Sequence, residues 1–357
     1  MKILSIESSC DETSASVIEK SEHSISALSN TTATSMVIHA ATGGIIPENA
    51  ARMQVKYILP VIVSALIDSR TGITKTSTDI SKKVSEEKIR LANQIIVQDI
   101  EAIAVTYGPG LIGSLLIGVE TAKTLAYTFN KPIIPVNHLL AHIYANYIGR
   151  KEKEIKFPFL GLIVSGGHTD LLLFVDHDKY TWLGGTRDDA AGEAFDKVGR
   201  LLNLSYPAGP EIEQRARLVS NPTVKFKSPL IGSNDFDFSF SGLKAEVSRF
   251  VGEKGQIDTN LKNQICYATQ KAIIDVLVKK VLKARDEHNV KMILVGGGVS
   301  ANETFRKILS SQSDIPVLFP EKEYATDNAA MIGAYALLNI KAKKWSDIIA
   351  NPELYFA

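Results

Sequence analysis

The chain has 357 residues, of which 45% are apolar and 22% are charged, and its formal net charge is +1. This composition excludes a disordered or fibrous chain, and the length predicts two domains. The small net charge excludes the strong positive field of a protein that binds nucleic acid unaided, so any contact with RNA requires a local basic patch or a partner protein.

An apolar strand opens the chain. Residues 3–6 and 15–18 predict two strands, and the polar residues 7–13 predict a loop between them. This loop contains Asp11 and Glu12, a carboxylate pair that either forms a polar turn or faces a phosphate or a metal ion. The strand starts too early for a signal or transit peptide, and the apolar runs are far shorter than the roughly 18 residues that span a bilayer. We therefore expect a cytoplasmic protein without membrane association.

A polar insertion and an α/β unit follow. Residues 69–98 are rich in Lys, Ser, Thr and Glu and predict a solvated insertion within the first lobe. Residues 102–106 then predict a strand and residues 115–129 a helix, with a glycine-rich loop between them. This strand, loop and helix order is typical of an α/β fold.

Two histidines follow the strand-like residues 133–136. His138 and His142 are four residues apart, so they share one face of a helix that Asn137 is placed to cap, and both imidazoles could bind one cation. The alternative is that both are polar packing residues. A zincin-type protease is disfavoured, because Leu139 stands where that motif has its general-base glutamate.

Two histidines leave a metal site incomplete, and we expect a carboxylate as the third ligand. Asp327 is the best candidate. It precedes a small-residue helix at residues 329–338, so its alternative role is the N-cap of that helix. Two histidines with one carboxylate suit iron(II) or zinc(II) and leave positions open for substrate oxygens.

The second half of the chain repeats the opening pattern. Residues 159–164 and 170–175 predict two strands, and Ser165, Gly166 and Gly167 lie in the turn between them. Glycines in such a turn can expose backbone N–H groups to a phosphate, although many turns of this kind only reverse the chain.

A glycine turn also follows the strand-like residues 291–295. A helix is predicted after it at residues 301–309, with Ser300 as a possible N-cap, and such a helix presents its N-terminus to an anionic ligand. Residues 261–285 have apolar side chains at helical spacing and predict a packed helix. Asp196 lies in an acidic helix start, where it is either solvated or bonded to ribose hydroxyls.

Together these segments resemble, almost end to end, the tRNA threonylcarbamoyladenosine transferases of the TsaD type, once described as O-sialoglycoprotein endopeptidases. The resemblance rests on His138, His142, the acidic segment 188–197, the TDN motif at 326–328, and the motifs IESSCDET (6–13), GGIIPE (43–48), GPGL (108–111), VSGGHT (164–169), DFSFSGLK (237–244) and GGVSAN (297–302).

This resemblance implies an α/β fold of two ribonuclease-H-like lobes, of the actin/Hsp70/sugar-kinase superfamily, with a central cleft. We expect an N-terminal lobe of residues 1–134 with 326–357, and a C-terminal lobe of residues 135–325. The implied reaction transfers the threonylcarbamoyl group of threonylcarbamoyl-AMP to the exocyclic N6 amine of adenosine 37, in tRNAs that read codons beginning with A, and releases AMP.

The resemblance also implies the ligands and partners. One divalent metal per subunit, iron(II) or else zinc(II), is expected on His138, His142 and Asp327. The implied partners are tRNA, a paralogous subunit of the same fold and a small P-loop ATPase. The implied site residues are Asp11 and Glu12 for catalysis at the acceptor side, and Ile163, Val164, Ser165, Gly166, Gly167, Asp196, Gly209, Glu213 and Asn302 for the adenylate.

The main alternative is a nucleotide-binding ATPase or phosphotransferase of the same fold. A metal held by two histidines disfavours it, because kinases of this architecture surround magnesium with carboxylates and water. A nucleotide-gated assembly subunit, which would bind without turnover, is a further alternative.

Overall fold

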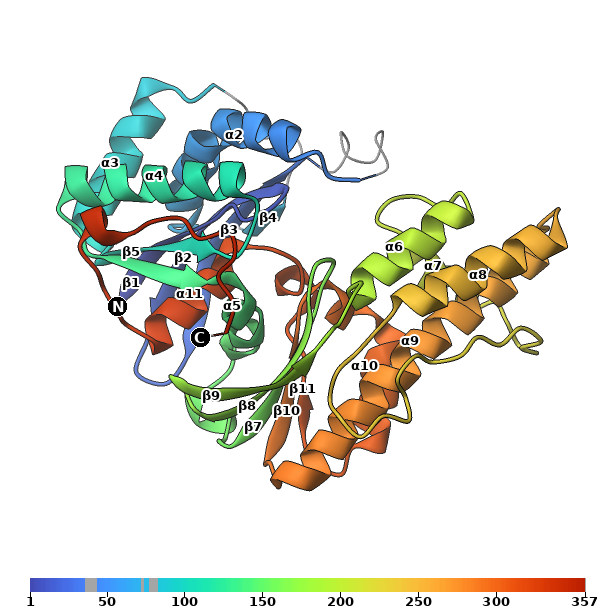
Figure 1. Cartoon of the computed structure of the whole chain (residues 1–357). Coiled ribbons are helices and arrows are strands. Elements are labelled where there is room, and N and C mark those ends of the chain that lie inside the picture. Colours follow the sequence, from blue (N-terminus) through green and yellow to red (C-terminus); the bar gives the residue numbers. More distant parts are fainter. Residues whose placement is uncertain (36–43, 72–73, 77–82, 357) are drawn as a thin grey trace. The chain divides into compact units, whose positions relative to one another are not determined.

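The computed structural model describes residues 1–35, 44–71, 74–76 and 83–356. The chain forms two compact units, Met1–Ile155 with Asp327–Ala357 and Lys156–Thr326, which we describe one at a time (Figure 1). The first unit reaches Ile155, beyond residue 134 where we placed the end of the first lobe. The cause is local packing, because the helical segments after residue 137 contact the helix that follows Asp327.

A six-stranded sheet forms the centre of the first unit, in the order β4-β3-β2-β1-β5-β6. Strands β1, β2 and β3 form an antiparallel meander, whereas β5 and β6 run parallel to β1, and β4 runs parallel to β3. The strands are β1 (Lys2–Glu7), β2 (Glu12–Lys20), β3 (Ile25–Thr34), β4 (Thr74–Thr76), β5 (Ala102–Gly108) and β6 (Ile133–Asn137).

Helices cover both faces of this sheet (Figure 1). Alternating residues of β1 point to opposite faces: Leu4 and Ile6 belong to the core under α2 and α4, while the Ser5 hydroxyl donates to the Ala329 carbonyl of α11. One face carries α2 (Pro47–Asp68), α3 (Glu86–Asp99) and α4 (Ile112–Phe129), and the other α5 (His138–Tyr144) and α11 (Ala329–Leu338); the short 3-10 helices of this unit are Ala145–Tyr147, Glu152–Glu154 and Trp345–Asp347.

Helix α2 is long and apolar enough to cross a membrane by length and composition alone. The lengths of the uninterrupted apolar runs alone predict no such segment. Of the 18 consecutive residues that make α2 apolar enough, 56% are buried inside the structure. Val61, Ala65 and Leu66 pack into the core beneath the helix. The burial identifies α2 as a core helix of this unit.

Residues 69–98 are more ordered than a solvated insertion would be, as far as the structure describes them. Helix α3 packs against α2 and buries Ala92, Ile95 and Ile96, which lie three or four residues apart on one helical face. Residues 72–73 and 77–82 lie outside the described part of the chain. The polar residues Glu86, Glu87 and Lys88 at the start of α3 are exposed.

The second unit has a five-stranded sheet in the order β11-β10-β7-β8-β9. Strands β7, β8 and β9 are antiparallel neighbours, and β10 and β11 run parallel to β7. Five strands of the first unit, β3-β2-β1-β5-β6, have the same order and directions, so the repeat predicted from the sequence is confirmed. The strands are β7 (Phe159–Val164), β8 (Thr169–Asp176), β9 (Lys179–Gly185), β10 (Met292–Gly296) and β11 (Val317–Leu318).

The predicted packed helix is confirmed as α9, whose residues Ile273, Leu277 and Val281 lie in the core of this unit. The helix after the glycine turn begins later than predicted: Ser300 lies in a 3-10 helix, and Asn302 is the N-cap that accepts a hydrogen bond from Phe305 N at 2.9 Å. The helices are α6 (Ala191–Leu201), α7 (Gly209–Ala216), α8 (Ser241–Lys254), α9 (Thr259–His288) and α10 (Glu303–Gln312), with 3-10 helices Gly298–Ala301 and Lys322–Tyr324.

The C-terminal segment is fastened to the end of β5. Asn351 N donates to the Tyr107 carbonyl at 2.7 Å, and Gly110 N donates to the Pro352 carbonyl at 3.4 Å. A Cβ atom on Gly108 would lie 2.0 Å from the Asn351 carbonyl oxygen, which is far inside van der Waals contact. Only glycine fits between β5 and this segment.

We expect Gly108→Ala to push the C-terminal segment away from β5. The free energy of unfolding, measured by urea denaturation, should fall by about 1–3 kcal/mol, as is usual for overpacking, and residues 345–356 should be cleaved faster by proteases. Gly252→Ala is the matched control, because its Cβ meets open space in the exposed helix α8; it should raise stability by about 0.5–1 kcal/mol. Wild-type stability in Gly108→Ala would contradict the close contact.

Candidate functional site

The two candidate histidines lie on α5, as predicted. Asn137 caps this helix, and its side-chain oxygen accepts hydrogen bonds from the backbone N–H groups of Leu139 at 2.9 Å and Leu140 at 3.4 Å. His138 and His142 are both buried, and their rings meet edge to face with centroids 4.7 Å apart. The cap and the spacing therefore place both imidazoles on one buried helix face.

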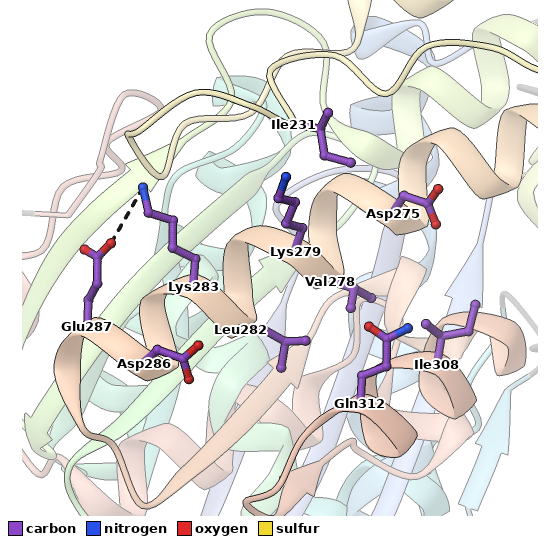
Figure 2. Close-up of a pocket in the computed structure, with 10 residues that line it drawn as sticks. All are labelled: Ile231, Asp275, Val278, Lys279, Leu282, Lys283, Asp286, Glu287, Ile308 and Gln312. Carbon is purple, nitrogen blue, oxygen red and sulfur yellow. Dashed lines mark ion pairs between the residues drawn. The ribbon is translucent and has the colours of Figure 1, made fainter.

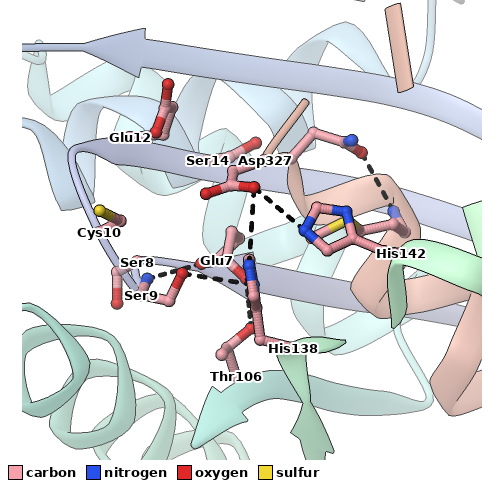
Figure 3. A network of polar contacts seen from close by, with 12 residues as sticks. Glu7, Ser8, Ser9, Cys10, Glu12, Ser14, Thr106, His138, His142 and Asp327 are labelled. Carbon is pink, nitrogen blue, oxygen red and sulfur yellow. Dashed lines mark hydrogen bonds and ion pairs between the residues drawn. The ribbon is translucent and has the colours of Figure 1, made fainter. Parts of the chain in front are cut away.

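Asp327 joins these histidines from the far end of the chain (Figure 3). Its Oδ1 atom lies 3.6 Å from His138 Nε2 and 3.3 Å from His142 Nε2, and one ligand atom from each of the three residues falls within 4.8 Å of the others. The N-cap of α11 is Asn328, whose side chain accepts from Met331 N at 3.1 Å. The alternative role that we kept open for Asp327, a helix cap, is wrong.

The geometry of this group fits a divalent cation. Nitrogen and oxygen ligands lie about 2.0–2.2 Å from zinc, which separates neighbouring ligand atoms by about 3–3.5 Å. Within the described part of the chain, neither ring nitrogen of His142 makes a hydrogen bond, although Nε2 lies in an ion-pair contact 3.3 Å from Asp327 Oδ1. A buried imidazole that makes no hydrogen bond requires an explanation. A bound cation supplies one, and this donor set suits iron(II) or zinc(II) better than magnesium.

A second carboxylate, Glu7, lies behind His138 at the end of β1 (Figure 3). Its Oε2 atom lies 3.0 Å from His138 Nδ1 and accepts from Thr106 Oγ1 at 2.5 Å, and its Oε1 accepts from Ser9 N at 2.6 Å. Burial raises the pKa of Glu7, but His138 lowers it more, and the net direction is downward. Burial likewise lowers the pKa of His138, but Glu7 and Asp327 raise it more, to about 9.

Glu7 is not among the predicted site residues, because the sequence assigns it to the polar loop at residues 7–13. The available signal was its position as the last residue of a buried strand, where a carboxylate must find a partner. Its partners come from β5 and α5, so local sequence could not identify them.

Helix α2 binds the segment that contains Asp11, in the loop, and Glu12, at the start of β2. The Nε2 atom of Gln54 donates to the backbone carbonyl oxygens of Cys10 at 2.9 Å and Glu12 at 3.0 Å. Burial first, and then the charges of Asp11 and Asp327, raise the pKa of Glu12 well above its usual range. The structure therefore places both acidic residues in the electrostatic surroundings of the candidate metal ligands, within the same unit.

The remaining candidates lie in the second unit, beginning with the turn after β7. Ile163 and Val164 are fully buried at the end of β7. The Ser165 hydroxyl accepts from His168 N at 3.1 Å and closes the turn. Gly192 N, in the first turn of α6, donates to the Ser165 carbonyl at 3.1 Å, which brings the start of this helix against the turn.

Asp196 connects α6 with α7. Its Oδ1 atom accepts from Ala208 N at 2.7 Å, directly before Gly209, the first residue of α7. Burial raises the pKa of Asp196 to about 6. A Cβ on Gly209 would meet nothing within 4 Å, so this helix start is open. A poorly solvated carboxylate beside an exposed backbone suits recognition of a polar ligand.

Glu213 connects α7 with α10, and Asn302 connects α10 with α9. Glu213 Oε1 accepts from Thr304 N at 3.0 Å, in the first turn of α10, and Asn302 Nδ2 donates to Gln270 Oε1 at 2.9 Å. Gly297 has a left-handed φ of 93°, and a Cβ there would lie 2.4 Å from the Val164 carbonyl oxygen. The second-unit candidates thus form one connected set, which includes the starts of α7 and α10 and the middle of α6 and α7.

A separate groove of about 560 Å³ lies along α9 and α10 (Figure 2). Lys283 Nζ and Glu287 Oε1 form an ion pair 3.6 Å apart within it. None of its ten lining residues is a candidate site residue; they are Ile231, Asp275, Val278, Lys279, Leu282, Lys283, Asp286, Glu287, Ile308 and Gln312. The groove is therefore distinct from the connected set described above.

Comparison with solved structures finds chains of the same fold, and the expected α/β fold with two lobes of related build is confirmed. Full-length HypF, solved in a phosphate- and nucleotide-bound form, matches with a TM-score of 0.53 and 14% identity, over 73% of this chain and 51% of HypF. This chain thus spans about half the length of HypF. Component A of (R)-2-hydroxyglutaryl-CoA dehydratase from Acidaminococcus fermentans matches with a TM-score of 0.50 and 11% identity, over 95% of this chain and 99% of that one.

Comparison of sequences identifies the family. Residues 85–334 match the TsaD family model, described as tRNA N6-adenosine threonylcarbamoyltransferase. Proteins of that name from Dehalococcoides mccartyi and Clostridium kluyveri are 46% and 42% identical to this chain, over 94% and 98% of it and 92% and 96% of their own lengths. This chain therefore belongs to the tRNA N6-adenosine threonylcarbamoyltransferases, the enzymes that attach the threonylcarbamoyl group to N6 of adenosine 37 in tRNA.

Proposed function

We propose that His138, His142 and Asp327 hold one iron(II) or zinc(II) ion during transfer of the threonylcarbamoyl group from threonylcarbamoyl-AMP. The observation that carries this proposal is that one ligand atom from each of the three residues lies within 4.8 Å of the others, with His142 Nε2 3.3 Å from Asp327 Oδ1. Bound there, the cation supplies Lewis-acid polarisation of substrate oxygens.

The second unit binds the adenylate in this proposal. Gly166 and Gly167 have open space above their backbone, so their N–H groups can face the phosphate or the acyl oxygen. Asp196 accepts hydrogen bonds from the ribose hydroxyls, and Asn302 and Gly209 lie against the nucleoside. Glu213 holds α10 beside them through its hydrogen bond with Thr304. The role of these residues is to fix the carbamoyl carbon for attack.

Asp11 and Glu12 act at the acceptor side. The N6 amine forms a bond to the carbamoyl carbon, the bond from that carbon to the phosphate oxygen breaks, and AMP leaves with the electron pair. The amine must also lose a proton. A carboxylate at this position, Asp11 or Glu12, accepts that proton as a general base.

We also infer that a paralogous subunit of the same fold and a small P-loop ATPase assist the reaction in the cytoplasm. Two observations support protein partners: the net charge of +1 gives little attraction for tRNA, and Val55 and Leu59 expose apolar side chains one turn apart on α2. Strong tRNA binding by the isolated chain that persists at high salt would contradict this inference.

The metal proposal predicts about one equivalent of iron or zinc in protein purified without chelators. His138→Ala with His142→Ala removes both nitrogen ligands, so elemental analysis of the double variant should find less than a tenth of the wild-type content. His23→Ala is the matched control, because this histidine is exposed beside Glu22 and outside the site. Metal retained by the double variant at the wild-type level would reject the site.

The raised pKa of Asp196 predicts opposite effects of one substitution on binding and on stability. Asp196→Asn keeps the acceptor for Ala208 N but removes the charge. Adenylate affinity of the wild type should fall as the pH drops through about 6 and the carboxylate is protonated, whereas that of the variant should be lower and flat from about pH 5 to 8.

Stability gives the independent measurement. Because the folded pKa of about 6 exceeds the usual 3.8, the buried charge destabilises the wild type increasingly as the pH rises between these values. In urea denaturation the variant should therefore be more stable by up to about 3 kcal/mol at pH 8, and equal to the wild type near pH 3.5. Glu253→Gln, at an exposed position of α8, should change neither profile.

The reaction itself is tested with threonylcarbamoyl-AMP, unmodified tRNA and the two partner proteins, added singly and together, followed by mass analysis of nucleosides. Asn302→Asp keeps the helix cap but loses the amide donor, and it should weaken adenylate binding about tenfold. Asp11→Ala should slow transfer more than about tenfold while binding is kept. Leu59→Glu should reduce turnover only in the presence of the paralogous subunit.

Two outcomes would contradict the proposed roles. Equal loss of adenylate binding in Asn302→Asp and Asp11→Ala would remove the division between the nucleoside and acceptor residues. Absence of modified adenosine under every partner combination, with ATP hydrolysed in excess, would favour the phosphotransferase alternative for the second-unit residues.

A further inference from the structure

The two ring nitrogens of His138 face two different carboxylates (Figure 3). Nδ1 lies 3.0 Å from Glu7 Oε2, and Nε2 lies 3.6 Å from Asp327 Oδ1. A ring that is hydrogen-bonded through Nδ1 has only Nε2 left for a cation. The contact with Glu7 therefore selects which nitrogen of His138 is available.

Glu7 is itself immobilised. Its side chain is 1% exposed, Thr106 Oγ1 from β5 donates to Oε2, and Ser9 N donates to Oε1. Strands β1 and β5 are hydrogen-bonded parallel neighbours, so both the carboxylate and the hydroxyl that holds it are fixed by the sheet. Both carboxylate oxygens are thus occupied by donors on the protein, which leaves Glu7 as an orienting group and not a ligand.

His142 has one carboxylate contact, from Nε2 to Asp327 Oδ1 at 3.3 Å, and within the described part of the chain its ring nitrogens make no hydrogen bond. Its ring packs edge to face against that of His138. The orientation of the pair consequently depends on the anchored ring. A change at Glu7 should therefore affect the binding site as a whole.

The charges point the same way. With two neutral imidazoles, the carboxylates of Asp327 and Glu7 carry a total charge of −2, which a divalent cation balances. We propose that Glu7 is a positioning residue of the metal site, which fixes His138 with Nε2 toward the cation and supplies the second balancing charge. This inference rests on the proposed metal site and goes beyond it, since Glu7 is not one of the ligands.

The deciding experiment measures the dissociation constants of zinc(II) and iron(II) for the full chain, by competition with a chromophoric chelator. Glu7→Gln keeps the size of the side chain but removes its charge, and it should bind both metals 10–100-fold more weakly, as is typical when an orienting carboxylate is lost. Binding within twofold of the wild type, in variant protein that unfolds cooperatively, would overturn the inference.

Ser29→Ala is the matched control for buried polarity. Ser29 lies on β3 of the same sheet, is fully buried, and donates to the Ala65 carbonyl at 2.7 Å. Its substitution should lower stability without changing either dissociation constant. An equal loss of metal affinity in this control would show that Glu7→Gln acts through general destabilisation, which would also overturn the inference.

A measurement on the wild type remains decisive even where Glu7→Gln fails to fold. In protein loaded with cadmium-113 and labelled with nitrogen-15 in histidine, the metal coupling should appear at Nε2 of His138, with a slowly exchanging proton on Nδ1. Coupling at Nδ1 would overturn the inference. A wild type that binds no metal at all would instead reject the proposed metal site, and the two failures are thereby distinguished.

Discussion

The docking of α11 onto the central sheet is the interaction on which the candidate site depends, because it brings Asp327 to α5. The Ala329 N–H donates to Ser14 Oγ at 2.9 Å, and the Ala329 carbonyl accepts from Ser5 Oγ at 2.7 Å. Gly333 permits the close approach, since a Cβ there would lie 2.6 Å from the side chain of Ile18. Asp327 therefore depends on contacts between segments more than three hundred residues apart in the chain.

Much of this site could be predicted from the sequence. The four-residue spacing of His138 and His142, with Asn137 before them, identifies a capped helix with two ligands on one face. Asp327 could be proposed as a ligand, but its helix-cap alternative could be excluded only when the structure showed Asn328 in that role. The partners of Glu7 could not be predicted, because they come from other segments of the chain and no local pattern links them to it.

The same distinction applies to the fold: features set by the local sequence could be predicted, and features set by packing between distant segments could not. The repeated strand, loop and strand pattern predicted the first two strands of both sheets, because a run of apolar residues is a local property, whereas β3, β9 and β11 were not predicted. The boundary at Ile155 and the burial of one face of α3 are set by packing against α11 and α2. Similarly, Ser300 is a good helix cap by composition, but the 3-10 turn at Gly298–Ala301 moves the start of α10 to the residue after Asn302.

The metal site proposed around the buried ring of His142 has a thermodynamic consequence. An ion that binds only the folded chain adds RT ln(1 + [M]/Kd) to its stability, about 2.7 kcal/mol at a free metal concentration one hundred times Kd. For a chain that binds such an ion at the proposed site, the metal-free form in a chelating buffer and the metal-bound form in a metal-buffered solution differ in their free energy of unfolding. The folded fraction then becomes a function of free metal concentration, so that supply of the ion, and not only its presence at the site, sets how much of this protein is native.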